Sequence, residues 1–165
     1  MKQVIIRDLL ASGAASEIFF FDADVLVLDD PWSGAAAGAY DVKYQIEHVG
    51  SWADRHLRCN RPLNSGQLLL RSTAAALRAF EIMVSLKETI LGGQKLDQDY
   101  LLAALKMAGA RACHLDPQRF VGACRHHRVR SAPERNFITF HGTCLGSEDE
   151  KLRVLRNYLE RAKAR

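Results

Sequence analysis

The stretch that decides the fold reads Phe19-Phe20-Phe21-Asp22-Ala23-Asp24-Val25-Leu26-Val27-Leu28, and it joins two apolar runs through a pair of carboxylates. The first run, Glu17–Phe21, is short and rich in aromatic residues, which is typical of a buried strand. The second run, Val25–Leu28, is also only strand-length and ends at the turn-forming sequence Asp29-Asp30-Pro31. The stretch therefore predicts two short strands with a polar site at a strand end.

Apolar periodicity and capping signals predict alternating helices and strands along the rest of the chain. Four helices are expected: Lys2–Ala11 ended by Gly13, Ser72 or Thr73 to about Lys87, Asp97–Ala108 closed by Gly109, and a last helix capped by Ser147 and Glu150. Three further strands are expected over Gly66–Arg71, Ala112–Leu115 and Phe137–Phe140. Residues 33–62 are expected to form a long loop. This alternation indicates an α/β layer fold.

Length and composition are those of one ordinary globular domain. The chain has 165 residues, of which 48% are hydrophobic and 25% charged, and this balance excludes a wholly disordered chain. The net charge of +4 suits a small anionic ligand and is too weak by itself to indicate nucleic-acid binding. No apolar run approaches the roughly 18 residues of a membrane span, and the N-terminus lacks the apolar centre of a signal peptide. A chain without membrane or targeting segments is therefore expected.

The strongest chemical signal is the pair Asp22 and Asp24, which lie two residues apart directly after an apolar run. Buried charges are costly unless they are paired or bind a metal, and open α/β sheets place ligands at the ends of their strands. A hard divalent cation would offset the repulsion between the carboxylates and can bridge to phosphate oxygens. The alternative is a solvated turn that merely ends the strand, and the pair alone does not decide between the two.

Three further segments carry polar groups at the ends of predicted elements, and each has a structural alternative. Asn64-Ser65-Gly66 precedes a strand and permits close approach of a ligand, or it is simply an entry turn. Asp97-Gln98 opens a helix, where Asp97 is equally an ordinary N-cap. His141 ends a strand before a glycine-containing loop and a capped helix, an arrangement that favours anions, and its ring nitrogen can bind a metal. The alternatives are a structural histidine and, for Lys151, a solvated helix residue.

The kinds and order of these segments resemble the retaining nucleotide-sugar glycosyltransferases of the GT-A fold. Phe-Phe-Asp-Ala-Asp, Asn-Ser-Gly before a strand, Asp-Gln-Asp at a helix start, and His with a following Gly and Lys occur in that order. The chain looks most similar to the nucleotide-diphospho-sugar transferase family of plant-type arabinosyl- and xylosyltransferases, related to the glycogenin-like transferases, over about Lys2 to Tyr158. The resemblance implies an α/β, partial GT-A-like sheet flanked by helices. It also implies transfer of a sugar from a nucleotide-diphosphate donor to a glycan or glycoprotein acceptor.

The resemblance also implies a metal site. In such families the D-x-D pair binds a manganese ion that holds the diphosphate of the donor, so Asp22 and Asp24 take this role and His141 is the third protein ligand. Mn²⁺ (or Mg²⁺) is the expected cofactor, and a set of carboxylates and imidazole suits Mn²⁺. Lys151 resembles the basic residue that contacts phosphate. A cation and a lysine would stabilise the charge that develops on the leaving diphosphate.

The sugar-binding residues follow from the same resemblance. Asn64, Ser65 and Gly66 resemble the segment that lines the sugar pocket. Asp97 and Gln98 resemble the pair beneath the donor sugar, and they are the expected catalytic residues. The anomeric carbon becomes oxocarbenium-like during transfer, and a side-chain oxygen such as that of Gln98 can stabilise it. Retention of configuration is implied by the family alone.

One departure from the family concerns the start of the chain. Family members place a nucleotide-binding βαβ region before the D-x-D strand, whereas here only the helix over Lys2–Ala11 precedes it. Residues 1–165 are therefore expected to be a single truncated transferase domain, poorly active alone, with its base- and ribose-binding part missing or supplied by another chain. The compartment stays open, and the resemblance implies the Golgi lumen for a full-length eukaryotic member.

Two other classes of function have candidate residues. Five arginines and two histidines fall in the loop-like stretch Arg119–Arg135 and can form a basic patch for RNA or another polyanion, but only Phe120 is present there for base stacking. A zinc site is the second alternative, although its spacing fits no standard site and no C-x-x-C pair occurs. Its candidate ligands are Cys113, His114, Cys124, His126 and His127. The even number of cysteines, completed by Cys59 and Cys144, also permits two disulfides.

Overall fold

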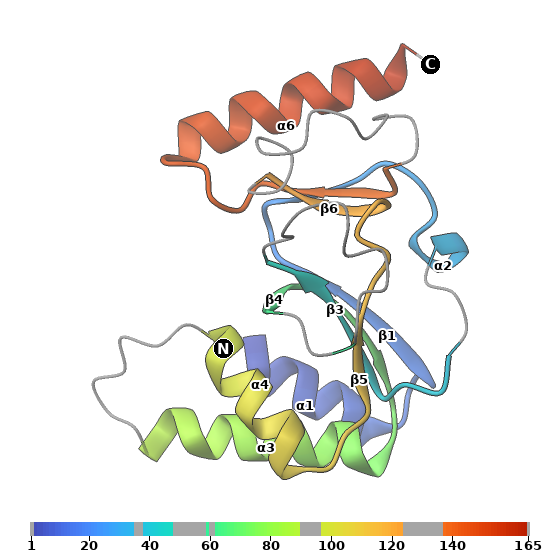
Figure 1. Cartoon of the computed structure of the whole chain (residues 1–165), viewed down its shortest axis with the longest axis vertical. Coiled ribbons are helices and arrows are strands. Elements are labelled where there is room, and N and C mark those ends of the chain that lie inside the picture. The colour runs from blue at the N-terminus through green and yellow to red at the C-terminus, as the bar shows by residue number, and fades with distance from the viewer. Residues whose placement is uncertain are drawn as a thin grey trace.

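The computed structural model describes residues 2–34, 38–47, 59, 62–89, 97–123 and 137–164. In chain order the elements are α1 (Lys2–Ser12), β1 (Glu17–Phe21), β2 (Val25–Val27), α2 (Pro31–Gly34), β3 (Val42–Ile46), β4 (Leu63–Arg71), α3 (Ala74–Thr89), α4 (Asp97–Met107), β5 (Ala112–His114), β6 (Phe120–Gly122), β7 (Thr139–His141) and α6 (Glu148–Lys163). They form two mixed sheets flanked by helices, which confirms the predicted α/β class (Figure 1).

The larger sheet has the strand order β1-β4-β3-β5, and the smaller one has the order β2-β7-β6. In the larger sheet β4 is antiparallel to both β1 and β3, while β5 is parallel to β3. In the smaller sheet β7 is antiparallel to β2 and parallel to β6. Figure 1 shows α1, α3 and α4 together on one side of the larger sheet, with α6 at the opposite end of the molecule beyond the smaller sheet.

Strand β4 is the centre of the core. Leu68 and Leu70 pack with α1, α3 and α4 in one apolar cluster that includes Phe80. Leu69 points to the other face and packs with Phe120 and residues of the segments around the smaller sheet. Burial on both faces explains the apolar run Leu68–Leu70 within this strand, and each buried leucine contributes about 1.5–3 kcal/mol of transfer free energy.

The bounds predicted from apolar periodicity and capping residues agree with the observed bounds of most elements to within a residue or two. β1 has the predicted bounds, but its side chains are only partly buried because it is the edge strand beside β4. Gly13 has a φ of +62°, as expected of a glycine that ends α1. The Ser147 side chain accepts a hydrogen bond from the Glu150 backbone N, which confirms the predicted cap of α6. Phe140 of β7 stacks on Tyr158, the buried residue of this helix, with 4.0 Å between the ring centroids.

The prediction of a loop over residues 33–62 is wrong for the part that becomes β3. Val42, Tyr44 and Ile46 alternate along this strand and are buried, so the period-two pattern was present but short. The partners of β3 are β4 and the distant β5, which the local sequence does not reveal. Residues 35–37, 48–58 and 60–61 of the predicted loop lie outside the described residues.

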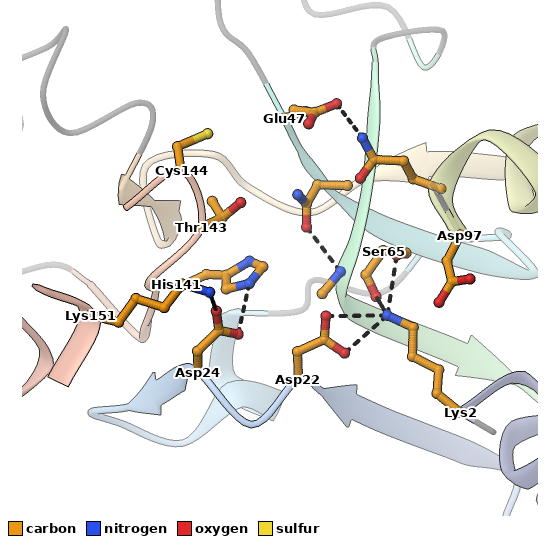
Figure 2. Close-up of a pocket in the computed structure, with 13 residues that line it drawn as sticks. Lys2, Asp22, Asp24, Glu47, Ser65, Asp97, His141, Thr143, Cys144 and Lys151 are labelled. Atoms are coloured by element: carbon orange, nitrogen blue, oxygen red, sulfur yellow. Dashed lines mark hydrogen bonds and ion pairs between the residues drawn. The ribbon is translucent and has the colours of Figure 1, made fainter. Parts of the chain in front are cut away.

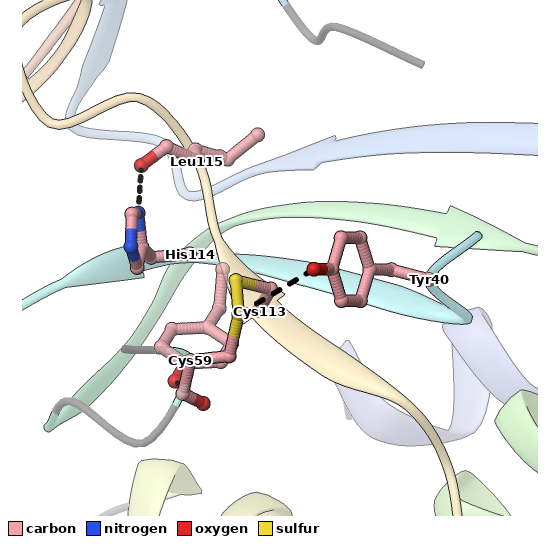
Figure 3. Close-up of a disulfide and its surroundings, with 6 residues drawn as sticks. Tyr40, Cys59, Cys113, His114 and Leu115 are labelled. Carbon is pink, nitrogen blue, oxygen red and sulfur yellow. Dashed lines mark hydrogen bonds between the residues drawn. A yellow bond between two sulfur atoms is a disulfide. The ribbon is translucent and has the colours of Figure 1, made fainter. Parts of the chain in front are cut away.

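A disulfide joins Cys59 to Cys113 across 54 residues of sequence (Figure 3). The Tyr44 hydroxyl donates to the Cys59 carbonyl oxygen at 3.1 Å, which ties the same segment to β3. Cys144 is disulfide-bonded as well. The zinc alternative is therefore wrong for Cys113, because its sulfur is already in a covalent bond, and the candidates at 124, 126 and 127 lie outside the described residues. Among the described helices, none combines the length and apolarity needed to cross a bilayer.

Candidate metal and nucleotide-sugar site

The two carboxylates lie where the two sheets meet. Asp22 directly follows β1 and Asp24 directly precedes β2, with a turn closed by the Val25 N–H donating to the Asp22 carbonyl oxygen at 3.1 Å. The turn is fixed from both sides, because the Asp22 N–H donates to the Gly66 carbonyl oxygen and the Gly142 N–H donates to the Asp24 carbonyl oxygen, each at 2.8 Å. Backbone bonds to both sheets therefore set the positions of the two acids.

His141 is brought to the same place by the register of the smaller sheet. It is the last residue of β7 and pairs with Val25, the residue after Asp24. Its ring is 4% exposed and lies directly over Gly66, where a Cβ would come within 2.1 Å of the ring carbon Cε1. Only glycine leaves this space, which explains the glycine of the Asn64-Ser65-Gly66 segment. That segment is part of β4 itself, so its interpretation as an entry turn is wrong.

The Asp22, Asp24 and His141 side chains each offer a ligand atom, and these atoms lie within 4.8 Å of one another. The Nδ1 of His141 is 2.7 Å from the Gln45 Oε1, and since an amide oxygen only accepts, Nδ1 is the protonated nitrogen. Nε2 then faces the Asp24 Oδ1 at 3.1 Å, so two acceptors point at each other. A divalent cation relieves this contact, and the donor set of two carboxylates and one imidazole fits such an ion.

Burial lowers the pKa of the His141 imidazole, although Asp24 and Asp22 act in the opposite direction. Burial alone would raise the pKa of Asp24, but a hydrogen bond from Lys151 and, at the low pH where the His141 ring is protonated, the charge of His141 hold it below its usual value. Asp24 is therefore ionised at neutral pH and His141 is predominantly neutral, the forms in which both groups bind metals.

Two lysines neutralise the carboxylates in the structure (Figure 2). The Lys151 Nζ lies 2.7 Å from the Asp24 Oδ2, and the Lys2 Nζ lies 2.9 and 3.2 Å from the two oxygens of Asp22. Lys2 also donates to the Ser65 carbonyl and hydroxyl oxygens at 3.2 Å. The site thus holds two separate lysine–aspartate pairs, Lys2 with Asp22 and Lys151 with Asp24, and this set of charges suits a cation together with a phosphate group.

The Asp97-Gln98 pair lines the same cavity from the start of α4. Lys87 Nζ donates to the Asp97 Oδ1 at 2.9 Å, and the Gln98 Nε2 donates to the Glu47 Oε2 at 2.6 Å. Burial would raise the pKa of Asp97, but the hydrogen bond and charge of Lys87 outweigh it and lower the pKa.

All nine site residues predicted from the sequence line one open cavity of about 450 Å³. This size suits a small-molecule ligand. The full lining is Lys2, Asp22, Asp24, Glu47, Asn64, Ser65, Gly66, Asp97, Gln98, His141, Thr143, Cys144 and Lys151. The structure therefore places all the predicted residues together.

Four lining residues were missed by the sequence analysis: Lys2, Glu47, Thr143 and Cys144. Lys2 had a weak signal, because a cation in the first turn of a helix opposes the helix dipole and α1 has no acid there. Cys144 has a φ of 63°, a left-handed conformation that is uncommon for a residue other than glycine. Glu47 fell within the stretch assigned as loop, so nothing in its local sequence set it apart.

A family model described as nucleotide-diphospho-sugar transferase matches residues 1–155 of the chain. The chain belongs to this family. Solved structures of glycosyltransferases share its fold. The galactosyltransferase LgtC, in complex with donor and acceptor sugar analogs, superposes with a TM-score of 0.58 at 15% identity, covering 97% of this chain and 66% of LgtC. The glycosyltransferase GlyE of Streptococcus pneumoniae TIGR4 superposes with a TM-score of 0.64 at 14% identity, covering 98% of this chain and 42% of GlyE. No curated protein matches.

This member of the transferase family spans 42% to 66% of the length of the solved structures that it matches. At 13% to 15% identity those structures support the shared fold and do not assign a substrate. The alternative of an RNA-binding loop loses its stacking residue, because Phe120 is 2% exposed and forms β6. Arg119 is bonded to the Ser33 carbonyl oxygen, and residues 124–136 of that loop lie outside the described residues.

Proposed function

We propose that this chain binds a nucleotide-diphosphate sugar through a divalent cation, preferably Mn²⁺, and transfers the sugar to a glycan or glycoprotein acceptor with retention of configuration. The observation that carries the proposal is the convergence of Asp22, Asp24 and His141, with ligand atoms within 4.8 Å, beside two lysines in one cavity. Mixed carboxylate and imidazole ligands favour Mn²⁺, with Mg²⁺ as the alternative ion. Family membership supports the reaction class.

The two lysines take part in donor binding. When bound, the cation stabilises the charge that develops on the leaving diphosphate. Asp22 and Asp24 would hold this cation, and they would then be shared between it and the ammonium groups of Lys2 and Lys151. The ammonium groups, which now bond these carboxylates at 2.7–2.9 Å, can then turn to phosphate oxygens at the same site. Before donor binding, the lysines pair with the carboxylates. In the proposed complex the cation pairs with the carboxylates and the lysines pair with the phosphates, so no buried charge is left without a partner.

The remaining wall positions the sugar. Asn64, Ser65 and Gly66 belong to the central strand β4, so they present a rigid surface to the sugar ring. Gln98 and Asp97, at the start of α4, line the same cavity. In our proposal the Gln98 amide oxygen lies against the anomeric carbon and stabilises its positive charge as the bond to the diphosphate breaks.

We further propose that residues 1–165 form one incomplete transferase domain, and that contacts to the base and ribose come from other residues or another chain. Within the described part of the chain, the cavity lining has no aromatic side chain besides the His141 ring, so it offers no platform on which a base can stack. Metal, phosphate and sugar each have candidate partners in this lining, whereas the nucleoside has none.

Calorimetric titration with Mn²⁺ and then UDP tests the metal site. We expect UDP binding that depends on Mn²⁺ and is abolished by EDTA, and we expect Asp24→Ala to weaken Mn²⁺ binding by more than tenfold, about 1.4 kcal/mol. Asp8→Ala is the matched control, because it removes an exposed carboxylate of α1 outside the cavity. Equal Mn²⁺ affinity in Asp24→Ala and the parent would contradict the assignment. Binding that falls with salt and ignores EDTA would indicate a polyanion-binding module instead.

A further inference from the structure

The side-chain amide of Gln98 is held in one orientation by Glu47. The Gln98 Nε2 donates to the Glu47 Oε2 at 2.6 Å, and both residues line the cavity. An ionised carboxylate only accepts hydrogen bonds, whereas an amide has one donating and one accepting end. The nitrogen of Gln98 must therefore face Glu47, and its oxygen must face the opposite way.

Glu47 is itself fixed by the backbone of the larger sheet. Its N–H donates to the Pro62 carbonyl oxygen at 3.1 Å, which continues the pairing of β3 with β4 by one residue. The register of this pair shifts between Tyr44 and Gln45. Such irregularities re-aim the side chains that follow them and occur next to active sites. The carboxylate therefore reaches the cavity from a rigid strand end.

Glu47 also differs from the other acids of the cavity. Asp22, Asp24 and Asp97 each accept a hydrogen bond from a lysine at 2.7–2.9 Å. For Glu47, within the part of the chain that the structure describes, the recorded side-chain partner is the neutral amide of Gln98. The contact of this partly buried carboxylate with Gln98, at 2.6 Å, is as short as the lysine contacts of the three aspartates, and it joins Glu47 to the residue that our proposal places against the sugar.

We propose that Glu47 is a positioning residue that keeps the amide oxygen of Gln98 turned toward the reacting carbon of the donor sugar. The inference rests on the proposed function. As the bond to the diphosphate breaks, that carbon gains positive charge, which an oxygen lone pair stabilises and an N–H group repels. The negative charge of Glu47 also polarises the amide, since bonds in series strengthen one another, and this increases the electron density on the Gln98 oxygen.

Nuclear magnetic resonance of the ¹⁵N-labelled chain tests the contact without requiring turnover. The Gln98 side-chain NH₂ signals are identified by their loss in Gln98→Glu. We expect these signals to be displaced from those of a solvated glutamine, and to move to the solvated position in Glu47→Ala. Glu81→Ala, an exposed glutamate on α3, is the matched control and should leave them in place. Unchanged Gln98 signals in Glu47→Ala would overturn the proposal.

Kinetics then separate positioning from direct donor binding. We expect Glu47→Ala to lower kcat for donor hydrolysis or transfer by about 10- to 100-fold, the order expected for a misplaced catalytic group, with KM changed by less than about threefold. The double variant Glu47→Gln/Gln98→Glu exchanges the carboxylate and the amide, so it restores the bond with an oxygen facing the sugar. It should recover at least about tenfold over Gln98→Glu alone. A loss confined to KM, or no recovery in the double variant, would overturn the proposal.

Failure of this inference and failure of the proposed function are distinguishable. A parent chain that binds neither Mn²⁺ nor UDP contradicts the proposed function, whatever the Gln98 signals show. A parent chain that binds both, with Gln98 signals indifferent to Glu47, contradicts the positioning role alone.

Discussion

Replacement of Gly66 by alanine is the sharpest test of how the strand positions the metal ligands. A Cβ at this position would lie 2.1 Å from Cε1, 2.7 Å from Nδ1 and 2.8 Å from Nε2 of His141. Ordinary van der Waals contact begins at 3.4 Å, so the ring has to retreat by the difference of about 1.3 Å. The ring has no free direction for this movement, because Gln45 holds one nitrogen at 2.7 Å and Asp24 faces the other at 3.1 Å.

Two consequences of different size follow from Gly66→Ala. Overpacking of a buried site costs about 1–3 kcal/mol of folding stability. Metal binding suffers more, because ligand distances are tolerated only within about 0.2 Å and the required movement exceeds this several-fold. We expect the Mn²⁺ affinity to fall by at least tenfold, about 1.4 kcal/mol, while the chain still folds.

Calorimetric titration with Mn²⁺ measures the affinity, and thermal unfolding measures the stability of the same sample. Gly146→Ala is the matched control, since its Cβ would have its closest neighbour at 3.4 Å, an oxygen of the flexible Glu150 side chain. It should leave both quantities near those of the parent. If Gly66→Ala folds and binds Mn²⁺ as tightly as the parent, His141 is not a ligand in the place that the structure gives it.

Three further predictions concern the whole domain. Replacing both Cys59 and Cys113 by serine removes a cross-link between residues 54 apart in sequence. The free energy of unfolding, measured by urea titration, should fall by about 4 kcal/mol because the unfolded chain gains entropy. A loss below about 1 kcal/mol would contradict this. Burial would raise the pKa of Asp41, but hydrogen bonds from Arg111 hold it below 3.8, so the ionised carboxylate stabilises the fold above about pH 4 and this stabilisation is lost as pH falls through the lowered pKa. Asp41→Asn should therefore make the free energy of unfolding depend less on pH between pH 7 and pH 2. An unchanged pH dependence would disprove this. The purified chain should turn over a nucleotide sugar more slowly than about once per second, and a faster rate would end the incomplete-domain proposal.

Local chemistry made the helices α1, α3, α4 and α6 and most strands predictable, whereas α2 and β6 lie in stretches that were predicted to be turn or loop. The helix from Asp97 ends before Gly109, which has a φ of +65°, and the Ser147 cap needed only neighbouring residues to be recognised. β3 was not predictable in this way, because its evidence is mainly non-local. It pairs in parallel with β5, where Val42 lies opposite Ala112 about seventy residues along the chain. Strands defined by distant partners carry little local signal.

The same distinction applies to the cavity. Asp22 and Asp24 were predictable because two acids next to an apolar strand conflict with burial, and a conflict of this kind marks a functional site. Glu47 carries no such conflict in its local sequence, and Lys2 carries only the weak one of a cation at a helix start. Their roles depend on contacts across 51 and 20 residues, with Gln98 and Asp22 respectively, and only the folded chain brings these side chains together.

The pairing of lysines with metal ligands also bears on how the site folds. A structural zinc site commonly forms only when the ion binds, because its ligands have no other partners, so the ion contributes much of the folding free energy. In this chain Asp22 and Asp24 are already neutralised by Lys2 and Lys151, and backbone bonds to both sheets fix their positions. The two carboxylates are therefore in place without an ion, and in our proposal an entering cation would have to displace two ammonium groups. This competition lowers the affinity of the site for the cation when no donor is present. An anionic diphosphate that accepts hydrogen bonds from the displaced lysines raises the affinity for the cation. If the proposed function is right, binding of cation and donor should therefore be mutually reinforcing.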